Sequence, residues 1–543
     1  MSEIELKLSS SPEQLEKVRQ ILDSMAQVPR PAASTLVAVY YDSEELKLHQ
    51  QGLSLRVRDE DGRQVQTLKS HDGGNPDILT RNEWEDVITD HIPDFSAPQS
   101  GPRLTEVVSP GELRPLFKTI VRRTKFELEP RPSTRVEVAL DEGEIRNADD
   151  DSSEAICEVE LELKSGEPAA IYDLGLRLLE AAPLRIETRS KAARGYKLMS
   201  ANGALEPAVH ARRVPLNGSM TVEGTLQSIG RSCIAHLLCN EPAVLAGAGE
   251  GIHQMRVAAR RLRAVLSALK PMIPMEQYRW VLEELKWLAD MLGPARNWDV
   301  FAANLQPVVQ ALPVEPELPR LAQVAEQRRR AAYEQAEEAI RSQRYTATML
   351  QLAQWFEARS WRDQPASEHA ALLFAPIGEV APRLIERSWR RARKRSRHFD
   401  QLTQEQRHRL RIALKKLRYT IEFLADLFDH REVKALQKRL KPLQEDLGHR
   451  NDVRTAHTLT EEVSRHVNEG GNEISRAGGI VLGWHGRGLI DREPKLRKSV
   501  KRLRRAKPFW RRGGVPIATL VAPADAAHGT TNEAARGHAA AGS

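Results

Sequence analysis

Closely spaced carboxylates occur twice in the chain, with basic residues on the same segment or nearby ones. The residues concerned are Glu3, Glu5, Glu158, Glu160 and Glu162, and Lys7 follows the first pair. Carboxylates clustered in this way repel one another unless they hold a hard divalent cation such as Mg²⁺ or Mn²⁺. Arginine and lysine beside that cation would hold phosphate oxygens. The combination predicts phosphoryl-transfer chemistry.

Apolar and charged residues alternate in the segments that carry these carboxylates and in others like them. These segments are residues 4–8, 53–58, 135–138 and 157–164. A period of two predicts β-strands with every charge on one face of a sheet. Either the sheet is open and this face is solvated, or the sheet closes and the charges line its interior. The repeated Glu-x-Glu triplets favour the closed sheet. Residues 12–26 and 168–182 are predicted to form short amphipathic helices.

The order of motifs over residues 1–200 resembles the CYTH domains of the triphosphate tunnel metalloenzymes. The opening Glu3-Ile4-Glu5-Leu6-Lys7 is similar to their Glu-x-Glu-x-Lys signature. The other matching segments are 40–43 (YYDS), 55–58 (LRVR), 67–69 (TLK), 81–85 (RNEWE), 138–143 (VALDEG) and 190–196 (SKAARGY). The resemblance implies an α+β protein that begins with an eight-stranded antiparallel β tunnel.

That resemblance also implies roles for individual residues. The metal ligands, for Mg²⁺ or Mn²⁺, would be Glu3, Glu5, Glu158, Glu160 and Glu162. The residues that grip phosphate would be Lys7, Arg56, Arg58, Lys69, Arg123, Lys191 and Arg194, with the last two near a helix that plugs one end. The catalytic group would comprise Glu5, Lys7 and Glu160, around a metal-bound water that attacks the terminal phosphorus. Arg122 and Lys125 compete with Arg123 for one position, and the carboxylate that orients the water stays open.

The substrate expected from this resemblance is inorganic triphosphate, cleaved to pyrophosphate and phosphate. Other members of the family are thiamine-triphosphatases or adenylyl cyclases. The sequence offers no clear aromatic platform for thiamine or a nucleoside, which favours plain triphosphate over thiamine triphosphate or nucleotides.

The second half of the chain contains an internal repeat. The residues His253, Arg256, Arg260 and Arg263 recur 155 residues later as His408, Arg411, Lys415 and Arg418. A Leu-Gly segment containing Asp follows each copy, at 292–299 and at 447–452, and the second is two residues shorter. At about 100° per residue, each basic set falls on one helical face with leucines nearly opposite. Such a face is either simply solvated or binds a polyanion, and its histidines either cap and pack or donate to phosphate. Its occurrence twice, almost without acids, favours the polyanion.

This repeat resembles the CHAD family, α-helical domains with conserved histidines that commonly follow a CYTH domain. The resemblance covers residues 220–510. It implies two pseudo-symmetric four-helix bundles flanking a basic cavity, in which those eight residues bind inorganic polyphosphate. Basic runs at 389–397 and 495–512 extend the surface, and their few aromatic residues argue against base stacking and a specific nucleic-acid partner. Nothing in this half combines a nucleophile, a base and a metal site, so we expect no catalysis there.

Charge and composition separate the two halves. Residues 1–200 hold 26 Lys and Arg against 37 Asp and Glu, whereas the whole 543-residue chain has a net charge of +7. The second half is therefore strongly basic. The predicted domains are a CYTH tunnel over 1–200, a linker over 201–219, a CHAD helical domain over 220–512 and a disordered tail over 513–543.

Three scattered cysteines and the absence of a signal peptide or a long apolar run predict a cytoplasmic protein without a membrane partner, with association at polyphosphate granules as one place for it. Three functions follow from the two halves. The first is a metal-dependent triphosphatase tethered to a polyphosphate-binding module. The second is a non-catalytic polyphosphate-binding protein associated with granules. The third is a nucleic-acid-binding protein, with strongly salt-dependent affinity for DNA and RNA. The complete set of acidic and basic residues favours the enzyme.

Overall fold

The computed structural model of the chain describes residues 2–25, 33–60, 62–70, 80–199, 207–466 and 471–511. The predicted tail at 513–543 and the first part of the predicted linker lie outside the described residues. Within the described ranges, no helix is both long enough and apolar enough to cross a membrane.

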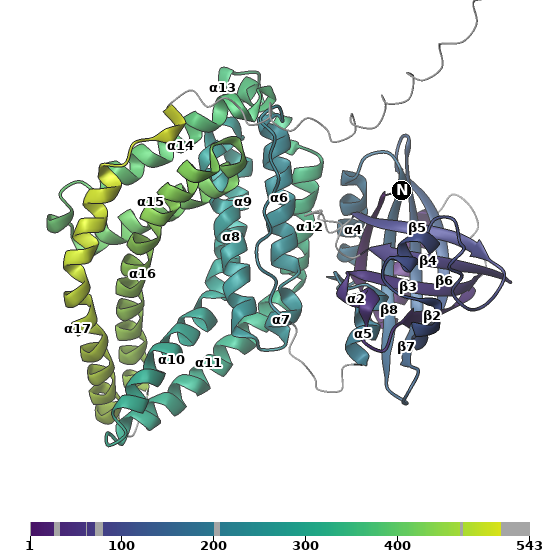
Figure 1. Ribbon diagram of the computed structural model, residues 1–543, viewed down its shortest axis with the longest axis horizontal. Coiled ribbons are helices and arrows are strands. Elements are labelled where there is room, and N and C mark those ends of the chain that lie inside the picture. Colours follow the sequence, from purple (N-terminus) through teal and green to yellow (C-terminus); the bar gives the residue numbers. More distant parts are fainter. Residues whose placement is uncertain are drawn as a thin grey trace, which may run out of the picture. The chain divides into compact units, whose positions relative to one another are not determined.

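Antiparallel strands close into a barrel in the first 200 residues (Figure 1). The strands are β1 (Ser2–Ser9), β2 (Ser34–Asp42), β3 (Leu53–Glu60), β4 (Arg63–Ser70), β5 (Thr80–Ile88), β6 (Arg114–Arg131), β7 (Thr134–Asn147), β8 (Ser153–Ser165) and β9 (Arg185–Ile186). Their order is β5-β4-β3-β2-β6-β7-β8-β1-β9, and an additional pairing of β5 with β1 closes the ring. The expected eight-stranded tunnel is confirmed, with one difference. A ninth strand of two residues pairs with β1 outside the closed ring.

Apolar side chains lie on the outer face of the barrel wall, where helices cover them. The helices of this region are α1 (Pro12–Met25), α2 (Lys47–Gln50), α3 (Gly101–Thr105), α4 (Ala169–Ala181) and α5 (Lys191–Leu198). Val138 and Leu161 are fully buried, and α1 and α4 contact the strands that carry them with buried residues such as Leu15 and Leu174. Burial of each such side chain stabilises the fold by about 1.5–3 kcal/mol. Because side chains alternate along a strand, the charged residues face the interior.

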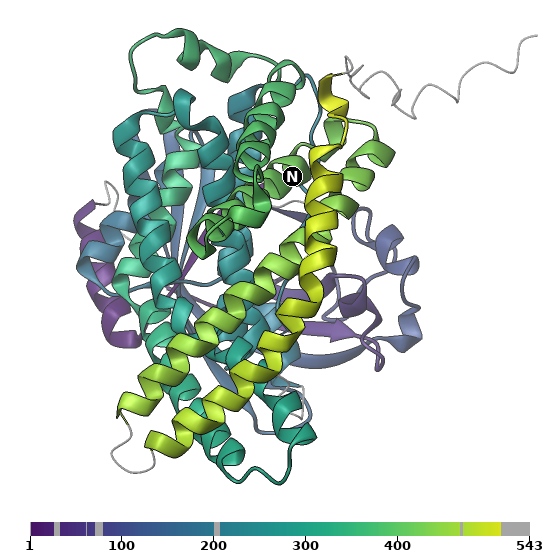
Figure 2. The ribbon, with the colours of Figure 1, turned by 90° about the vertical axis from the view of Figure 1, so that its left-hand side faces the viewer.

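Helices make up the rest of the described chain. The first set is α6 (Val222–Leu238), α7 (Glu241–Leu245), α8 (Gly249–Leu269), α9 (Met275–Met291), α10 (Gly293–Ala311), α11 (Glu317–Arg341) and α12 (Gln343–Glu357). The second set is α13 (Glu368–Ala371), α14 (Ile377–Arg395), α15 (Gln404–Phe423), α16 (His430–His466) and α17 (Gly471–Arg504). Figure 2 shows the long helices α16 and α17 side by side. Ion pairs such as Arg450–Glu493 join these two helices.

The helix boundaries confirm the internal repeat. Helix α6 begins at 222 and α14 at 377, α8 at 249 and α15 at 404, and α9 at 275 and α16 at 430, each 155 residues apart. Helices α9 and α10 together end at 311 and α16 ends at 466, which keeps the same spacing. The copies differ at the Leu-Gly pair, since Leu292 separates α9 from α10 whereas α16 runs unbroken through Leu447. Helix α11 corresponds to α17.

The chain divides into two compact units. Among the described residues, the first comprises those up to Val214 together with those of Leu226–Ala371 and Asp446–Glu493. The second comprises Pro215–Thr225, Leu372–Glu445 and the residues described after Glu493. Within the first unit, α12 packs on α4, and the side-chain amide of Gln343 donates to the carbonyl of Leu179 over 2.6 Å. The barrel and the first helices therefore share one unit.

Candidate active site

The barrel interior is apolar at one end and charged beyond it. At the apolar end, helix α5 buries Ala192 and Tyr196 against a cluster that includes Phe117. Gly195 permits this close approach, because a Cβ there would lie 2.1 Å from the ring of Phe117. The hydroxyl of Tyr196 donates to the buried carboxylate of Asp42, with 3.0 Å between the oxygens. Helix α5 therefore fills this end of the barrel and presents its first turn to the charged region.

Strand register places one basic and two acidic residues in a row across β6, β7 and β8. Arg123 lies opposite Asp141, and Asp141 lies opposite Glu158. Nε and Nη2 of Arg123 donate to the two carboxylate oxygens of Asp141 over 2.7 and 2.6 Å. A bidentate contact of this kind fixes both side chains.

Glu160 lies at the centre of the charged network. It is opposite Lys7 on β1 and opposite Ala139 on β7, whose short side chain leaves room beside it. Nζ of Lys7 and Nζ of Lys191 each donate to Oε1 of Glu160 over 2.8 Å. Nη2 of Arg123 donates to Oε2 over 2.5 Å. One carboxylate thus gathers three cations from three different elements.

Helix α5 brings two cations to the acidic side of the barrel. Nζ of Lys191 lies 2.8 Å from Asp141 and 2.9 Å from Glu158 in addition to its contact with Glu160. Arg194 donates through Nη1 to Glu158, and its Nη2 donates to a backbone carbonyl on β8 over 2.5 Å. These contacts join the plug helix to the acidic residues.

Charge pairing keeps this network ionised despite burial. Burial alone would raise the pKa of the Glu160 and Asp141 carboxyls, but Lys191 and the other cations hold both below their usual values, and that of Glu160 well below. Burial alone would lower the pKa of Lys191 and Arg123, whereas the carboxylates hold both well above their usual values. The network is therefore a set of fixed charges at neutral pH.

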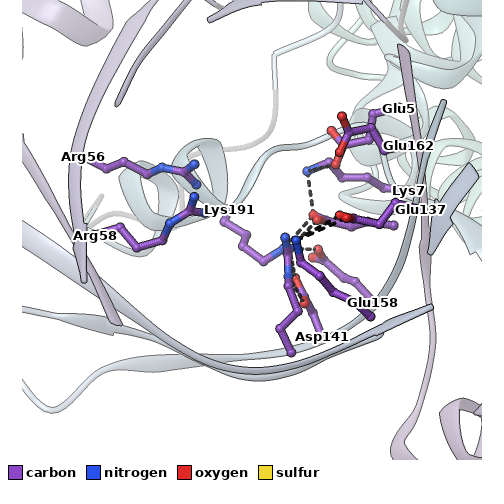
Figure 3. A network of polar contacts seen from close by, with 12 residues as sticks. Glu5, Lys7, Arg56, Arg58, Glu137, Asp141, Glu158, Glu162 and Lys191 are labelled. Carbon is purple, nitrogen blue, oxygen red and sulfur yellow. Dashed lines mark hydrogen bonds and ion pairs between the residues drawn. The ribbon is translucent and has the colours of Figure 1, made fainter. Parts of the chain in front are cut away.

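A second group of cations lies across the barrel. Figure 3 shows Arg56 and Arg58 on the opposite wall from Lys7. Nε of each guanidinium is buried and has no hydrogen-bond partner among the described residues. Nζ of Lys69 lies 2.7 Å from Glu83, and burial together with Arg56 lowers the pKa of Lys69. Buried donors that lack acceptors suit the oxygens of a phosphate chain.

Three buried carboxylates have the spacing of a divalent-cation site. One oxygen from each of Asp141, Glu158 and Glu160 lies within 4.8 Å of the other two. Carboxylate oxygens are the ligands that Mg²⁺ takes, and Mn²⁺ shares this preference. The donor set therefore fits a divalent cation.

The predicted metal ligands separate into three groups. Glu158 and Glu160 belong to the buried cluster. The carboxylate of Glu5 lies 3.2 Å from Nζ of Lys7, and Glu162 contacts Lys164 over 2.7 Å, one row further along the strands. The side chain of Glu3 lies outside the described residues. The structure thus brings together only part of the predicted set.

Asp141 is the site residue that the sequence analysis did not single out. Its signal was present, because Asp141 follows Glu137 on the same face of β7 while Val138 and Leu140 are buried on the other. Among the alternatives for the basic position on β6, Arg122 is exposed and Lys125 pairs with Glu137, so the geometry favours Arg123.

The basic residues of the repeat lie on partly exposed faces of α8 and α15. On α8 the face consists of His253, Arg256, Arg260 and Arg263, and on α15 of His408, Arg411, Lys415 and Arg418. Leu262 on α8 and Leu417 on α15 are fully buried behind them.

Three guanidinium groups of α8 have few acceptors among the described residues. Among the described residues, no carboxylate lies within ion-pairing distance of Arg256, Arg260 or Arg263. Arg256 donates to the carbonyl of Ala289 over 2.7 Å, and Nε of Arg260 is buried without a hydrogen-bond partner in the described ranges. On α15, Arg418 lies 3.8 Å from Glu422. Arg256, Arg260 and Arg263 thus carry positive charge with no carboxylate at ion-pairing distance in the described part of the chain.

Comparisons with known proteins agree with this division of the chain. The chain is 30% identical over 295 residues to an uncharacterized protein of Mycobacterium tuberculosis, covering 52% of each. It is 30% identical over 200 residues to an inorganic triphosphatase of Haemophilus influenzae, covering 37% of this chain and 56% of that protein. The chain thus spans about half the length of the curated relatives it matches.

Among solved structures, the CHAD domain of the plant Ricinus communis matches with a TM-score of 0.48 and 27% identity, covering 54% of this chain and 96% of that one. The family model of the CYTH domain matches residues 1–196, and that of the CHAD domain matches residues 228–461. The chain therefore contains a segment that matches the CYTH domain, followed by a segment that matches the CHAD domain.

Proposed function

We propose that the barrel hydrolyses inorganic triphosphate to pyrophosphate and phosphate with Mg²⁺ or Mn²⁺, and that the helical half binds inorganic polyphosphate. The observation that carries the first part is the pairing of two walls in one closed barrel. One wall holds the buried carboxylates Asp141, Glu158 and Glu160, and the other holds Arg56 and Arg58, whose Nε atoms are buried without a hydrogen-bond partner among the described residues. The triphosphatase activity named for the Haemophilus influenzae relative supports the same chemistry.

The barrel residues divide the work by position. Arg56, Arg58 and Lys69 would hold one end of the phosphate chain from one wall, while Lys7, Arg123, Lys191 and Arg194 would hold the other end from the opposite wall. A divalent cation held by Asp141, Glu158 and Glu160 supplies charge neutralisation at the phosphate oxygens when it is bound. Glu5 and Glu160 are the candidates to accept the proton of the attacking water, because both lie beside Lys7.

Enclosure strengthens these interactions. Inside the barrel the effective dielectric constant is lower than in water, so fixed charges aimed at the phosphate chain act more strongly. The apolar packing of α5 closes one end, which keeps the chain in line with the two walls. Positioning and electrostatic stabilisation are what phosphoryl transfer chiefly requires.

Polyphosphate binding by the helical half is supported by the unneutralised charge of α8. A chain of phosphates offers closely spaced anionic oxygens without bases, and the basic faces of α8 and α15 offer guanidinium donors that match them. In the second unit, Trp389 packs on Trp510 and Phe428 packs on Phe509, whereas Phe374 is exposed. The four packed residues do not offer a stacking platform for bases.

The test is phosphate release by the purified protein from tripolyphosphate, ATP, thiamine triphosphate and long-chain polyphosphate, each with Mg²⁺, Mn²⁺ or EDTA. We expect metal-dependent release with tripolyphosphate as the preferred substrate. Release from thiamine triphosphate or ATP in preference would assign a different substrate. No release from any of them, with long-chain polyphosphate still bound, would make the protein a polyphosphate receptor. Equal affinity for DNA would favour a nucleic-acid-binding function.

A further inference from the structure

The ammonium of Lys191 lies where a divalent cation would have to bind. Its Nζ is 2.8 Å from Asp141, 2.9 Å from Glu158 and 2.8 Å from Glu160. These are the same three carboxylates whose oxygens cluster within 4.8 Å. A divalent cation needs those oxygens at a still shorter distance. The ammonium and the metal therefore compete for one position.

Charge balance makes this competition strict. The three carboxylates already contact four cations, Lys7, Arg123, Lys191 and Arg194, in a buried setting. A divalent cation added to this set would leave excess positive charge away from water, which is costly. A triphosphate carries the opposite charge, so it draws the cations toward itself and leaves the carboxylates to the metal.

The side chain of Lys191 can move while its backbone stays in place. Lys191 is the first residue of α5, and the hydroxyl of Ser190 caps this helix by accepting from the backbone N–H of Ala193 over 3.0 Å. The bond from Tyr196 to Asp42 and the contacts of Arg194 hold the rest of the helix. A lysine has a flexible four-carbon stem with a compact charge, so rotation of the stem suffices to move Nζ.

The position of Lys191 allows that movement to end on the substrate. In Figure 3 its side chain extends between the wall of Arg56 and Arg58 and the wall of the carboxylates. A phosphate chain held by the two arginines would pass beside this stem. The ammonium would then exchange three carboxylate contacts for phosphate oxygens.

We propose that Lys191 is an internal counter-ion that occupies the metal position until a phosphate chain enters, so that the phosphate chain and the divalent cation bind cooperatively. This inference rests on the proposed triphosphatase site and adds how the metal and the phosphate chain affect each other's binding there. The coupling is reciprocal, because whatever triphosphate does to metal affinity, the metal must do to triphosphate affinity. The barrel would therefore bind the metal weakly when no phosphate chain is present, and it would not turn over a phosphate chain without the metal.

The experiment measures Mn²⁺ binding, by the electron paramagnetic resonance of free Mn²⁺, to the wild type and to Lys191→Met. Without any phosphate compound, we expect Lys191→Met to bind Mn²⁺ at least tenfold more tightly than the wild type. With saturating imidotriphosphate, a triphosphate with nitrogen bridges, we expect this difference to shrink to threefold or less. Both proteins are measured at the same concentration of the analogue. The amount of Mn²⁺ that free analogue binds is therefore the same in both and does not affect the comparison.

Matched variants locate the effect. Lys197→Met makes the same change at an exposed position of the same helix and should leave Mn²⁺ affinity at the wild-type value. Lys191→Arg keeps the charge and should bind Mn²⁺ no more tightly than the wild type. If both proteins bind Mn²⁺ and Lys191→Met binds it no more tightly than the wild type, Lys191 does not compete with the metal. The proposed metal site would then be retained. If no protein binds Mn²⁺ even with the analogue, the proposed metal site fails and the exchange fails with it.

A second measurement uses the wild type alone, in case Lys191→Met does not fold. Crystals grown with imidotriphosphate and EDTA should show Nζ of Lys191 on a phosphate oxygen and more than about 4 Å from Glu160, beyond ion-pairing distance. Nζ still placed between Asp141, Glu158 and Glu160 beside a bound analogue would overturn the proposal.

Discussion

Basic side chains beside the buried carboxylates of the barrel and basic side chains on helix α8 have opposite surroundings. In the barrel, carboxylates hold the pKa of Arg123 and Lys191 well above their usual values against the effect of burial. On α8, burial and the neighbouring Arg260 and Arg296 lower the pKa of Arg256 to about 10. Positive and negative charges in this part of the barrel thus neutralise each other. Binding of a phosphate chain would exchange some of these ionic contacts for contacts with phosphate. Helix α8 carries an excess of positive charge that an external polyanion would neutralise.

The largest expected effect concerns the carboxylate that gathers three barrel cations. Glu160→Gln keeps the shape of the side chain but removes its charge, so Lys7, Arg123 and Lys191 lose their shared partner. We expect kcat for tripolyphosphate to fall by about 10³-fold, the order of magnitude found when one preorganised electrostatic group is removed. Phosphate release under saturating metal measures the loss, and binding of long-chain polyphosphate should remain at the wild-type level.

Glu162→Gln is the matched control for this prediction. It makes the same change on the same strand and face, but Glu162 contacts Lys164 and lies outside the buried cluster. We expect kcat to fall by only about tenfold, the lower end of the loss that follows when a group just outside the metal ligands is removed. Equal losses in the two variants would contradict the assignment of Asp141, Glu158 and Glu160 as the centre of the site.

The sequence predicts those parts of this site that depend on local residue spacing within one strand. The alternation of β8 is enough to place Glu158 and Glu160 together on the inner face, because a strand repeats every two residues. Asp141 was missed since its closeness to Glu158 depends on the register between β7 and β8. The register between β1 and β8 likewise sets Glu162 opposite Glu5, one row away from the cluster. Sequence spacing alone does not fix register.

The helical half was predictable where its signal is local. The basic faces of α8 and α15 follow from the period of 3.6 and were predicted correctly as shared faces. The break at Leu292 was not predicted, although Pro294 at the start of α10 signals it, because proline has no backbone N–H to continue the preceding helix. His449 occupies the corresponding position in α16, and that helix continues through Leu447.

Stability should respond to the loss of a cation in opposite directions in the two regions. Arg123→Gln leaves Asp141 and Glu160 buried with fewer partners, which should destabilise the barrel by about 3–5 kcal/mol. Arg260→Gln removes a charge that crowds Arg256, and we expect no loss or a gain of about 0.5 kcal/mol at most. Hydrogen exchange of amides in β6–β8 and in α8 reports the two regions separately. Destabilisation of α8 by Arg260→Gln would show that its charge is compensated after all.

Acidification should destabilise the helical half before it destabilises the barrel. Burial and the nearby Arg261 lower the pKa of His236 to about 4, while its Nε2 lies 3.0 Å from the carbonyl of Val209 and 3.2 Å from Gln254. Because the unfolded value is about 6.5, the neutral folded form loses stability as the pH falls from 6.5 toward 4, by about 1.4 kcal/mol per unit of pH at most. The carboxyls of Glu160 and Asp141, with their lowered pKa, stay ionised over this range.

The measurement for the acid response is urea unfolding at pH 7, 5.5 and 4.5 for the wild type and His236→Gln. We expect the variant to be less stable at pH 7 but to lose less than the wild type on acidification, with a difference of about 2 kcal/mol by pH 4.5. Exchange of amides in α6 should rise before that of amides in the barrel. Parallel pH profiles in the two proteins would rule out His236 as the cause.

The smallest expected effect is on polyphosphate binding by α8, and it can be compared with the effect of the same substitution on the stability of that helix. One charge-assisted hydrogen bond contributes about 1.5 kcal/mol or more, so Arg260→Gln should weaken long-chain polyphosphate binding by about tenfold and flatten its dependence on salt. Turnover of tripolyphosphate should not change. Arg330→Gln, which removes an exposed arginine that pairs with Glu326 on α11, is the matched control and should leave both unchanged. If Arg260→Gln is as stable as the wild type and binds polyphosphate less tightly, the unneutralised charge of α8 serves binding rather than folding. If affinity is retained, the excess charge of α8 has another purpose, and the polyphosphate site must lie elsewhere on the helical half.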